Sequence, residues 1–221
     1  PGRITFRFQN VLAQLSVTHQ SLALRSLRVV QADVGEQVCR VGRPASYWFG
    51  VIDGLLKMSN DTAMGIPITF TGIPPGGWFG EGTVIKREAY RYNIQALRKS
   101  VVAGLSVEAF HWLIERSIPF NRFITQQLNE RLGQFIGARE IDRMTDADGR
   151  VARSLAALFH PVLYPGVGEM LRITPPESAA LRPLAAQRRL HVEAKIDDVA
   201  VEDFVLFAFE AEEALVAAVG E

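Results

Sequence analysis

The most informative stretch of the sequence is Gly76-Gly77-Trp78-Phe79-Gly80-Glu81-Gly82, which is followed ten residues after Glu81 by Arg91. A glycine-rich turn exposes backbone N–H groups that can cradle an anion. A carboxylate and a guanidinium close to it can hold hydroxyl groups and a phosphate. A glycine turn alone is weak evidence, so its meaning depends on the segments around it.

Composition limits the classes of protein that the chain can belong to. Its 221 residues are 48% hydrophobic and 22% charged, enough for one large domain or two small ones. The 24 basic and 24 acidic residues cancel, so any nucleic-acid site must be local. Cys39 is the single cysteine, which excludes a disulfide framework and a four-cysteine metal cluster within one chain. We expect a cytoplasmic protein without a signal peptide or a membrane-spanning segment.

The residues before the glycine turn read as short strands. β-branched and aromatic runs occur at 38–41, 47–52 and 66–70, separated by glycine, proline and asparagine turn signals. Such spacing predicts an antiparallel sandwich or jelly roll. A helical pattern of leucines covers about 11–27, and Ser106 is a suitable N-cap for a short helix after the last strand.

A longer helix is predicted from about Phe120 to Met144. Its apolar side chains form a narrow stripe at near-heptad spacing, and we expect the opposite face to be solvated. The stripe comprises Phe123, Ile124, Leu128, Leu132, Phe135 and Ile136, and the polar face comprises Gln126, Gln127, Glu130, Arg131, Gln134 and Arg139. Two interpretations stay open: the helix packs on its own domain, or it forms a two-stranded dimer seam that Gly133 and Gly137 allow to approach closely.

The chain after this helix is predicted to be a smaller helical unit. Residues 146–149 read as a hinge and 151–159 as a short helix. Thr174 is a good N-cap for another helix, with proline at the first helical position and Glu177 at the capping-box position.

This order of elements resembles the catabolite activator/FNR (CRP/FNR) family of bacterial transcription regulators. Phe79-Gly80-Glu81 resembles the family's phosphate-binding turn, and Arg91 has the spacing of its phosphate-binding arginine. The residues from Asn129 to Leu132 resemble the dimerisation helix, and those from Asp148 to Ala152 resemble the start of the DNA-binding domain. The resemblance implies an α+β chain. It would have an N-terminal antiparallel β jelly roll of the cyclic-nucleotide-binding type (1–119), a long dimerisation helix (120–145) and a C-terminal winged helix-turn-helix (146–221).

The ligand site implied by the resemblance consists of Phe79, Gly80, Glu81, Gly82, Arg91, Tyr92 and Phe135. Members that bind cyclic AMP have a serine or threonine where this chain has the bulky Tyr92, and a Thr-Ser pair where it has Phe135 and Ile136, so classical cyclic AMP binding is disfavoured. Glu81 and Arg91 are expected to bind another small anionic effector. The alternative is that they form an ion pair with each other in a pocket that binds no ligand. No resident cofactor, metal site or catalytic group is expected, because the four histidines are scattered and no nucleophile is paired with a base.

The resemblance also implies partners: a second copy of the chain, double-stranded DNA and, for an activator, RNA polymerase. Thr174, Gln187, Arg188 and His191 fall where DNA-contacting side chains of the family lie. Residues 196–221, however, carry eight acidic and no basic side chains, where the family has a basic wing. Such a segment repels phosphates. A sensor or interaction protein of the same fold without DNA binding therefore remains the alternative.

Overall fold

Two four-stranded antiparallel sheets form the N-terminal half of the molecule. The computed structural model describes residues 15–61, 67–143, 145, 147–168, 170–181 and 204–207. The first sheet has the order β1 (Leu27–Ala32), β8 (Ser100–Ser106), β3 (Tyr47–Asp53) and β6 (Trp78–Phe79). The second has the order β2 (Gln37–Cys39), β7 (Asn93–Ala96), β4 (Leu56–Asp61) and β5 (Pro67–Ile73). Sheet neighbours that are distant in sequence confirm the predicted jelly roll, which we call the sensor roll after the domain that the resemblance implies.

The two sheets enclose one core between their inner faces. Its fully or nearly fully buried side chains include Val51, Phe79 and Val102 from the first sheet and Leu56, Met58 and Ile94 from the second. Cys39 lies in this core, and burial raises the pKa of its thiol to about 12, against the lowering effect of its hydrogen bond with Tyr90. The thiol therefore stays protonated at neutral pH and behaves as a small apolar side chain.

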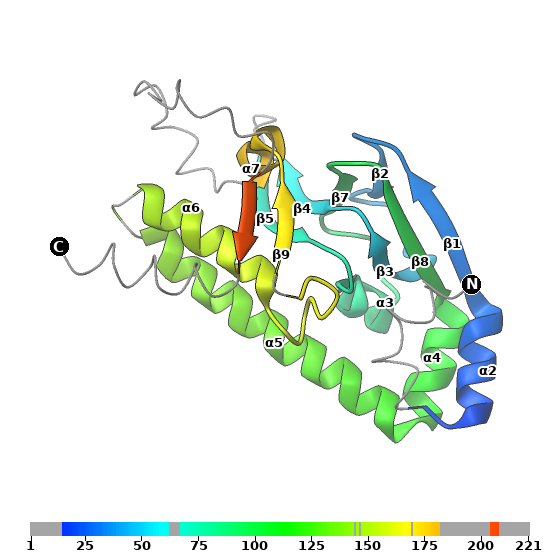
Figure 1. The fold of residues 1–221 in the computed structure, drawn as a ribbon. Coiled ribbons are helices and arrows are strands. Elements are labelled where there is room, and N and C mark those ends of the chain that lie inside the picture. Colours follow the sequence, from blue (N-terminus) through cyan, green and yellow to red (C-terminus); the bar gives the residue numbers. More distant parts are fainter. Residues whose placement is uncertain are drawn as a thin grey trace.

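Helices cover one side of the sensor roll and continue beyond it. They are α2 (Val17–Ser26), α3 (Glu81–Lys86), α4 (Val107–Arg116), α5 (Ile118–Arg143), α6 (Ala147–Ala156), a 3-10 turn (Ala157–Phe159) and α7 (Pro175–Leu181). A third sheet pairs β9 (Met170–Ile173) with β10 (Phe204–Phe207). Figure 1 shows α5 running the length of the molecule, with α2 and α4 beside its first half and α6 alongside its second.

Capping explains where several helices begin. The Ser106 hydroxyl accepts a hydrogen bond from the Ala109 N–H at 3.3 Å, as predicted for the start of α4. Within the described residues, the helix expected at about 11–27 spans Val17–Ser26 and begins at the N-cap Ser16.

An aromatic cluster joins the helices to the first sheet. Trp48 stacks on Trp78 with ring centroids 3.8 Å apart, and the rings of Phe110 from α4 and Phe120 from α5 meet Trp48 edge-on. Aromatic pairs of this kind stabilise a core beyond the area that they bury. Trp78 and Phe79 of the glycine-rich stretch are both buried.

The predicted hinge at 146–149 is wrong for residues 147–149, which form the first turn of α6. Beyond α6 the chain packs back on the sensor roll. Leu158, Leu171, Ile173 and Leu181 form an apolar cluster with Leu55 of the roll. We call residues 147–181 the C-terminal segment.

A close backbone approach fixes the loop between α6 and β9 against the glycine turn. Gly76 has φ 84°, and a Cβ atom at this position would lie 2.5 Å from the backbone nitrogen of Gly166. We therefore expect Gly76→Ala to lower the free energy of unfolding by about 1–3 kcal/mol, through a left-handed alanine and a backbone collision.

The matched control is Gly82→Ala in α3, where a Cβ atom would meet nothing within 4 Å. Because alanine favours a helix over glycine, this change should be neutral or stabilising by up to about 1 kcal/mol. Urea denaturation followed by circular dichroism measures both variants. Equal stabilities would show that the loop does not hold this position in solution.

Candidate functional site

A large cavity lies where the sensor roll, α5 and the C-terminal segment meet. Its volume is about 1190 Å³. Of the predicted ligand residues, Gly80, Glu81, Gly82, Arg91, Tyr92 and Phe135 line it. Phe79 does not line the cavity, because its side chain packs in the core between the sheets. Tyr92 and Phe135 thus form walls of the cavity and leave its interior open.

The glycine turn positions the carboxylate of Glu81 at the wall of this cavity. Gly80 has φ 93° and is the N-cap of α3, so Glu81 becomes the first residue of that helix. The Glu81 side chain is only 7% exposed. Its Oε1 lies 3.7 Å from Nε of Arg131. Its Oε2 is buried and has no hydrogen-bond partner among the described residues.

Arg131 of α5 holds the turn and a distant loop together. Its guanidinium donates hydrogen bonds to the carbonyl of Trp78 at 2.6 Å and to the hydroxyl of Tyr164 at 2.8 Å. It also donates to the Gln134 side chain at 3.2 Å. Burial alone would lower the pKa of Arg131, but Tyr164 and Glu81 raise it, so the net shift is upward and the charge is secure.

The expectation that the polar face of the long helix is solvated is wrong for two residues, since Gln127 and Arg131 are buried. Gln127 donates to the carbonyl of Val162 at 3.1 Å, so both side chains of α5 bind the loop that follows the 3-10 turn. Sequence reasoning missed Arg131 as a site residue. The available signal was its helical spacing from Gln127 and Gln134, which puts these polar side chains on one face.

Arg91 lies at the rim of the cavity. Its side chain is 75% exposed and forms an ion pair with Glu88 at 3.0 Å, and Glu88 also binds Lys86 at 2.9 Å. The hydrogen bond from Lys86, followed by the charges of Lys86 and Arg91, holds the pKa of Glu88 below its usual value despite some desolvation. The alternative in which Arg91 pairs with Glu81 is wrong, because the partner is Glu88.

Tyr92 lines the same cavity as the buried carboxylate of Glu81. Burial raises the pKa of its phenol, the nearby Glu81 charge raises it further, and a hydrogen bond with Thr83 opposes both effects. The phenol is therefore neutral at physiological pH and can act as a hydrogen-bond donor or acceptor.

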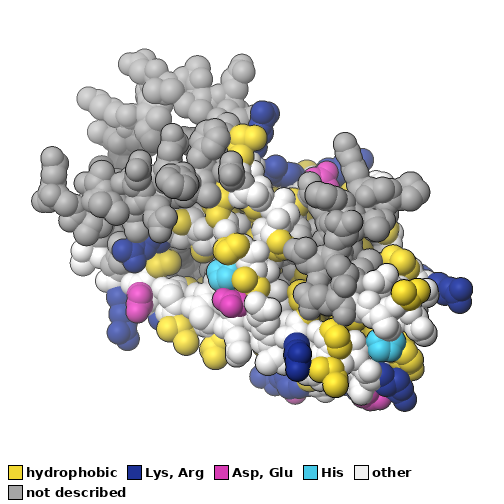
Figure 2. All heavy atoms as spheres, turned by 60° about the horizontal axis from the view of Figure 1, so that its bottom comes forward, with side chains coloured by type: hydrophobic (Ala, Val, Ile, Leu, Met, Phe, Trp, Pro, Cys, Tyr) yellow, Lys and Arg dark blue, Asp and Glu magenta, His cyan; other side chains and the backbone are white. Residues whose placement is uncertain are grey.

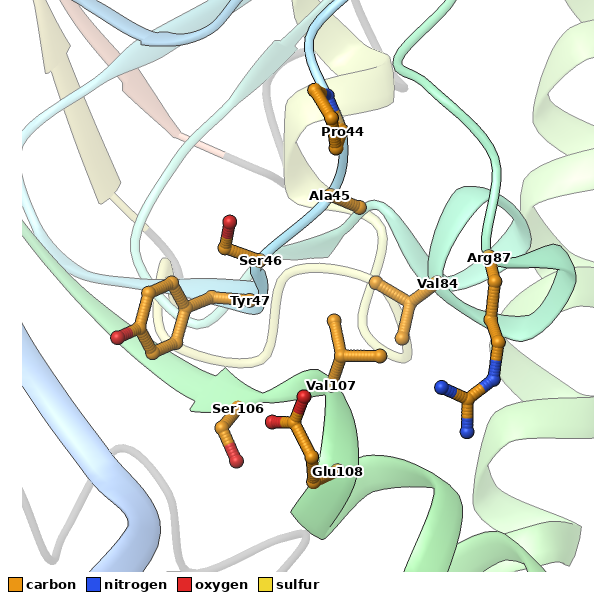
Figure 3. Close-up of a pocket in the computed structure, with 9 residues that line it drawn as sticks. All are labelled: Pro44, Ala45, Ser46, Tyr47, Val84, Arg87, Ser106, Val107 and Glu108. Carbon is orange, nitrogen blue, oxygen red and sulfur yellow. The ribbon is translucent and has the colours of Figure 1, made fainter.

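A second, smaller pocket of about 410 Å³ lies between the end of α3 and the start of α4 (Figure 3). Val84 and Val107 lie next to each other across its middle, with Arg87 at one side and Glu108 below (Figure 3). Both charged side chains are exposed. The predicted ligand residues all lie outside this pocket, so the larger cavity is the candidate site.

Thr174 and Glu177 form the predicted cap at the start of α7. The Thr174 N–H donates to Glu177 Oε2 at 2.8 Å and its hydroxyl donates to the same oxygen at 2.9 Å. Arg98 of the sensor roll adds two hydrogen bonds of 2.6 Å to the Glu177 carboxylate. The C-terminal segment is thereby fastened to the roll. The other predicted DNA-contacting residues, Gln187, Arg188 and His191, lie outside the described residues.

The described part of the chain holds no group of three or more His, Cys, Asp or Glu side chains that could bind a metal ion. His111 bonds the carbonyl of Val84 at 2.9 Å, and His160 lies 3.3 Å from Glu130. No described helix is long and apolar enough to cross a membrane.

Comparison with known proteins identifies the class of the sensor roll. Residues 29–117 match the cyclic nucleotide-binding domain family. No curated protein matches the chain. The resemblance found in the sequence is confirmed at this level: the chain carries a cyclic nucleotide-binding domain, followed by a long helix.

Solved structures of CRP/FNR-type regulators share the fold. A protein assigned to the crp/fnr family from Eubacterium rectale is 16% identical with a TM-score of 0.65, covering 93% of this chain and 97% of that one. The catabolite activator protein of Thermus thermophilus is 21% identical with a TM-score of 0.51, covering 94% and 98%. The sensor domain of the regulator DNR from Pseudomonas aeruginosa is 23% identical with a TM-score of 0.53, covering 64% and 93%. At these identities the likeness establishes the fold.

The cap at α7 gives a pH-dependent prediction. Desolvation would raise the pKa of Glu177, but its bonds with Arg98 and Thr174 outweigh this and hold the pKa below the ordinary 4.5. A depressed pKa contributes stability above the unfolded-state value that is lost as the pH falls through the folded-state value. Glu177→Gln should therefore destabilise the protein at neutral pH by about 1–2 kcal/mol.

The difference from the wild type should shrink as the pH falls below 4.5, the ordinary carboxyl value. Guanidinium denaturation at several pH values measures it. Glu115→Gln is the control, because its pair with Arg116 is exposed on both sides. A destabilisation that does not depend on pH would contradict the assignment.

Proposed function

We propose that this chain is a transcription regulator that senses a small effector in its cyclic nucleotide-binding domain and binds DNA as a homodimer in the cytoplasm. The observation that carries the proposal is the cavity at Glu81, because it touches three units at once. Its walls come from the sensor roll, from α5 and, at Ser154 and Leu181, from the C-terminal segment. An occupant can therefore influence the position of the segment that is expected to bind DNA.

The mechanism that we infer is a shift between two arrangements of the dimer. A ligand that binds one arrangement more tightly stabilises it by its difference in affinity. Two recognition helices can read half-sites about 34 Å apart only in the arrangement that presents them at that spacing. The contact of Arg131 with both the glycine turn and Tyr164 supports this coupling, since movement at the turn must disturb the loop.

The exposed part of α5 supports the dimer. The predicted stripe divides into two parts: Phe123 and Ile124 are buried against the roll and α4, whereas Leu132 and Ile136 are each 59% exposed. Leu128 and Phe135 are also exposed. Seen from the side on which α5 lies, hydrophobic side chains reach the surface between charged and polar ones (Figure 2). Apolar residues at this spacing suit a helix-to-helix seam.

We expect Leu132→Glu to raise the dissociation constant of the dimer at least about tenfold, because it buries an unpaired charge in the seam. Gln126→Glu is the control, since Gln126 is exposed and lies outside the apolar stripe. Light scattering at micromolar concentration gives the mass of each variant. A monomeric wild type would overturn the dimer itself.

DNA binding is tested by gel shift against a pool of random duplexes. We expect an affinity that falls as salt rises, because binding releases counterions from the phosphates. On a duplex selected from the pool, Arg188→Ala should weaken binding by about 1–3 kcal/mol, the usual value of a base contact. If no salt-dependent binding is seen, with or without added effectors, the proposal that the chain is a transcription regulator is wrong.

That failure would favour the second candidate, a sensor or interaction protein of the same fold without DNA binding. The observation behind it is the acidic composition of residues 196–221, which carry eight acidic and no basic side chains.

A further inference from the structure

The cavity is larger than a small-molecule site needs, and part of its wall belongs to the C-terminal segment. Ligand sites usually enclose about 300–1,000 Å³, and this one encloses about 1190 Å³. Besides the glycine turn and α5, its lining includes Ser154 of α6, Ala157 of the 3-10 turn and Leu181 of α7. An occupant that fills the cavity therefore touches the C-terminal segment directly.

The inner end of the cavity presents an acceptor that lacks a donor. Glu81 is buried, and its Oε2 has no hydrogen-bond partner among the described residues. Arg131, the nearest cation, already donates to Trp78, Tyr164 and Gln134. Because a buried acceptor without a partner is unfavourable, the site favours a ligand with a hydroxyl or amino group at this end.

The mouth of the cavity has the opposite chemistry. Lys86, Arg91 and Arg139 line it with exposed cations, and Glu88 supplies the compensating charge for two of them. The lining also includes the apolar side chains Ile68, Phe70, Leu128, Phe135 and Leu181. An acidic group therefore fits the mouth, and a hydrocarbon or ring body fits the middle.

We propose that the ligand is an amphipathic organic acid, longer than a cyclic nucleotide, that spans the cavity from Glu81 to the cationic mouth. Its apolar body packs on α5 and on the C-terminal segment, so that segment forms part of the binding site. The proposal deepens the proposed function, because it takes the cavity as the effector site. A cyclic phosphate fits less well, since Arg91 is 75% exposed and already engaged by Glu88.

The test is isothermal titration calorimetry of the full chain with ω-hydroxylauric acid, lauric acid and cyclic AMP. Both acids are used below their critical micelle concentrations. We expect one molecule of ω-hydroxylauric acid per chain, bound about tenfold more tightly than lauric acid, as a hydrogen bond to a buried carboxylate predicts. Cyclic AMP should bind more weakly than both acids. In Glu81→Gln the advantage of the hydroxyl should fall to about threefold, because a neutral acceptor bonds about half as strongly.

The contribution of the C-terminal segment has its own pair of variants. Ala157→Phe places a ring in the space proposed for the apolar body of the ligand, and by excluding part of that body it should weaken both acids at least about tenfold. Ala156→Phe, one residue earlier and outside the cavity lining, should leave their affinities unchanged. Ser154→Leu provides a second lining position if Ala157→Phe lowers the melting temperature.

Equal affinities for the two acids, tighter binding of cyclic AMP, or an unchanged affinity in both lining variants would overturn the proposal. Titration involves no DNA, so its outcome is independent of the gel shift. If the protein binds the acids but no DNA, the proposed function is wrong and the proposed class of ligand is retained.

Discussion

The buried charge of Arg131 is the constraint on which the arrangement of the molecule depends. A guanidinium removed from water must find acceptors, and removing its partners leaves an uncompensated charge in the interior. Arg131 finds them in three places: the turn at Trp78 and Glu81, its own helix at Gln134, and the loop at Tyr164. These segments are far apart in sequence, so the pairing fixes the helix, the turn and the loop in one mutual orientation.

Tyr164 shows how tightly this arrangement is packed. Its side chain is fully buried, its ring lies beside the Arg131 guanidinium at 5.7 Å, and it closes against Gly77 of the turn. Together with Leu163 it joins the core between the two sheets. The loop after the 3-10 turn is thus part of the sensor's interior. The sensor roll and the C-terminal segment consequently share a core, a cap at Glu177 and the walls of a cavity.

The sequence predicted the parts that depend on local chemistry. Turn residues bounded the strands, and Ser106 and Thr174 marked helix starts. Most of the ligand residues predicted from the glycine turn and its surroundings line one cavity. The parts that depend on tertiary packing could not be predicted. Arg131 belongs to the polar face of the long helix, and the helical pattern alone does not reveal that it is buried. Sequence spacing alone also does not show that Arg91 forms its ion pair with Glu88, three residues away, and not with Glu81.

The stacked pair of Trp48 and Trp78 gives the protein an intrinsic optical reporter. Two indoles with ring centroids 3.8 Å apart and planes inclined by 18° couple electronically, which produces a paired signal in the far-ultraviolet circular dichroism spectrum. Trp78 is also the residue whose carbonyl Arg131 binds. A rearrangement of the turn would change the geometry of the pair. Such a rearrangement can therefore be followed spectroscopically in the unlabelled protein.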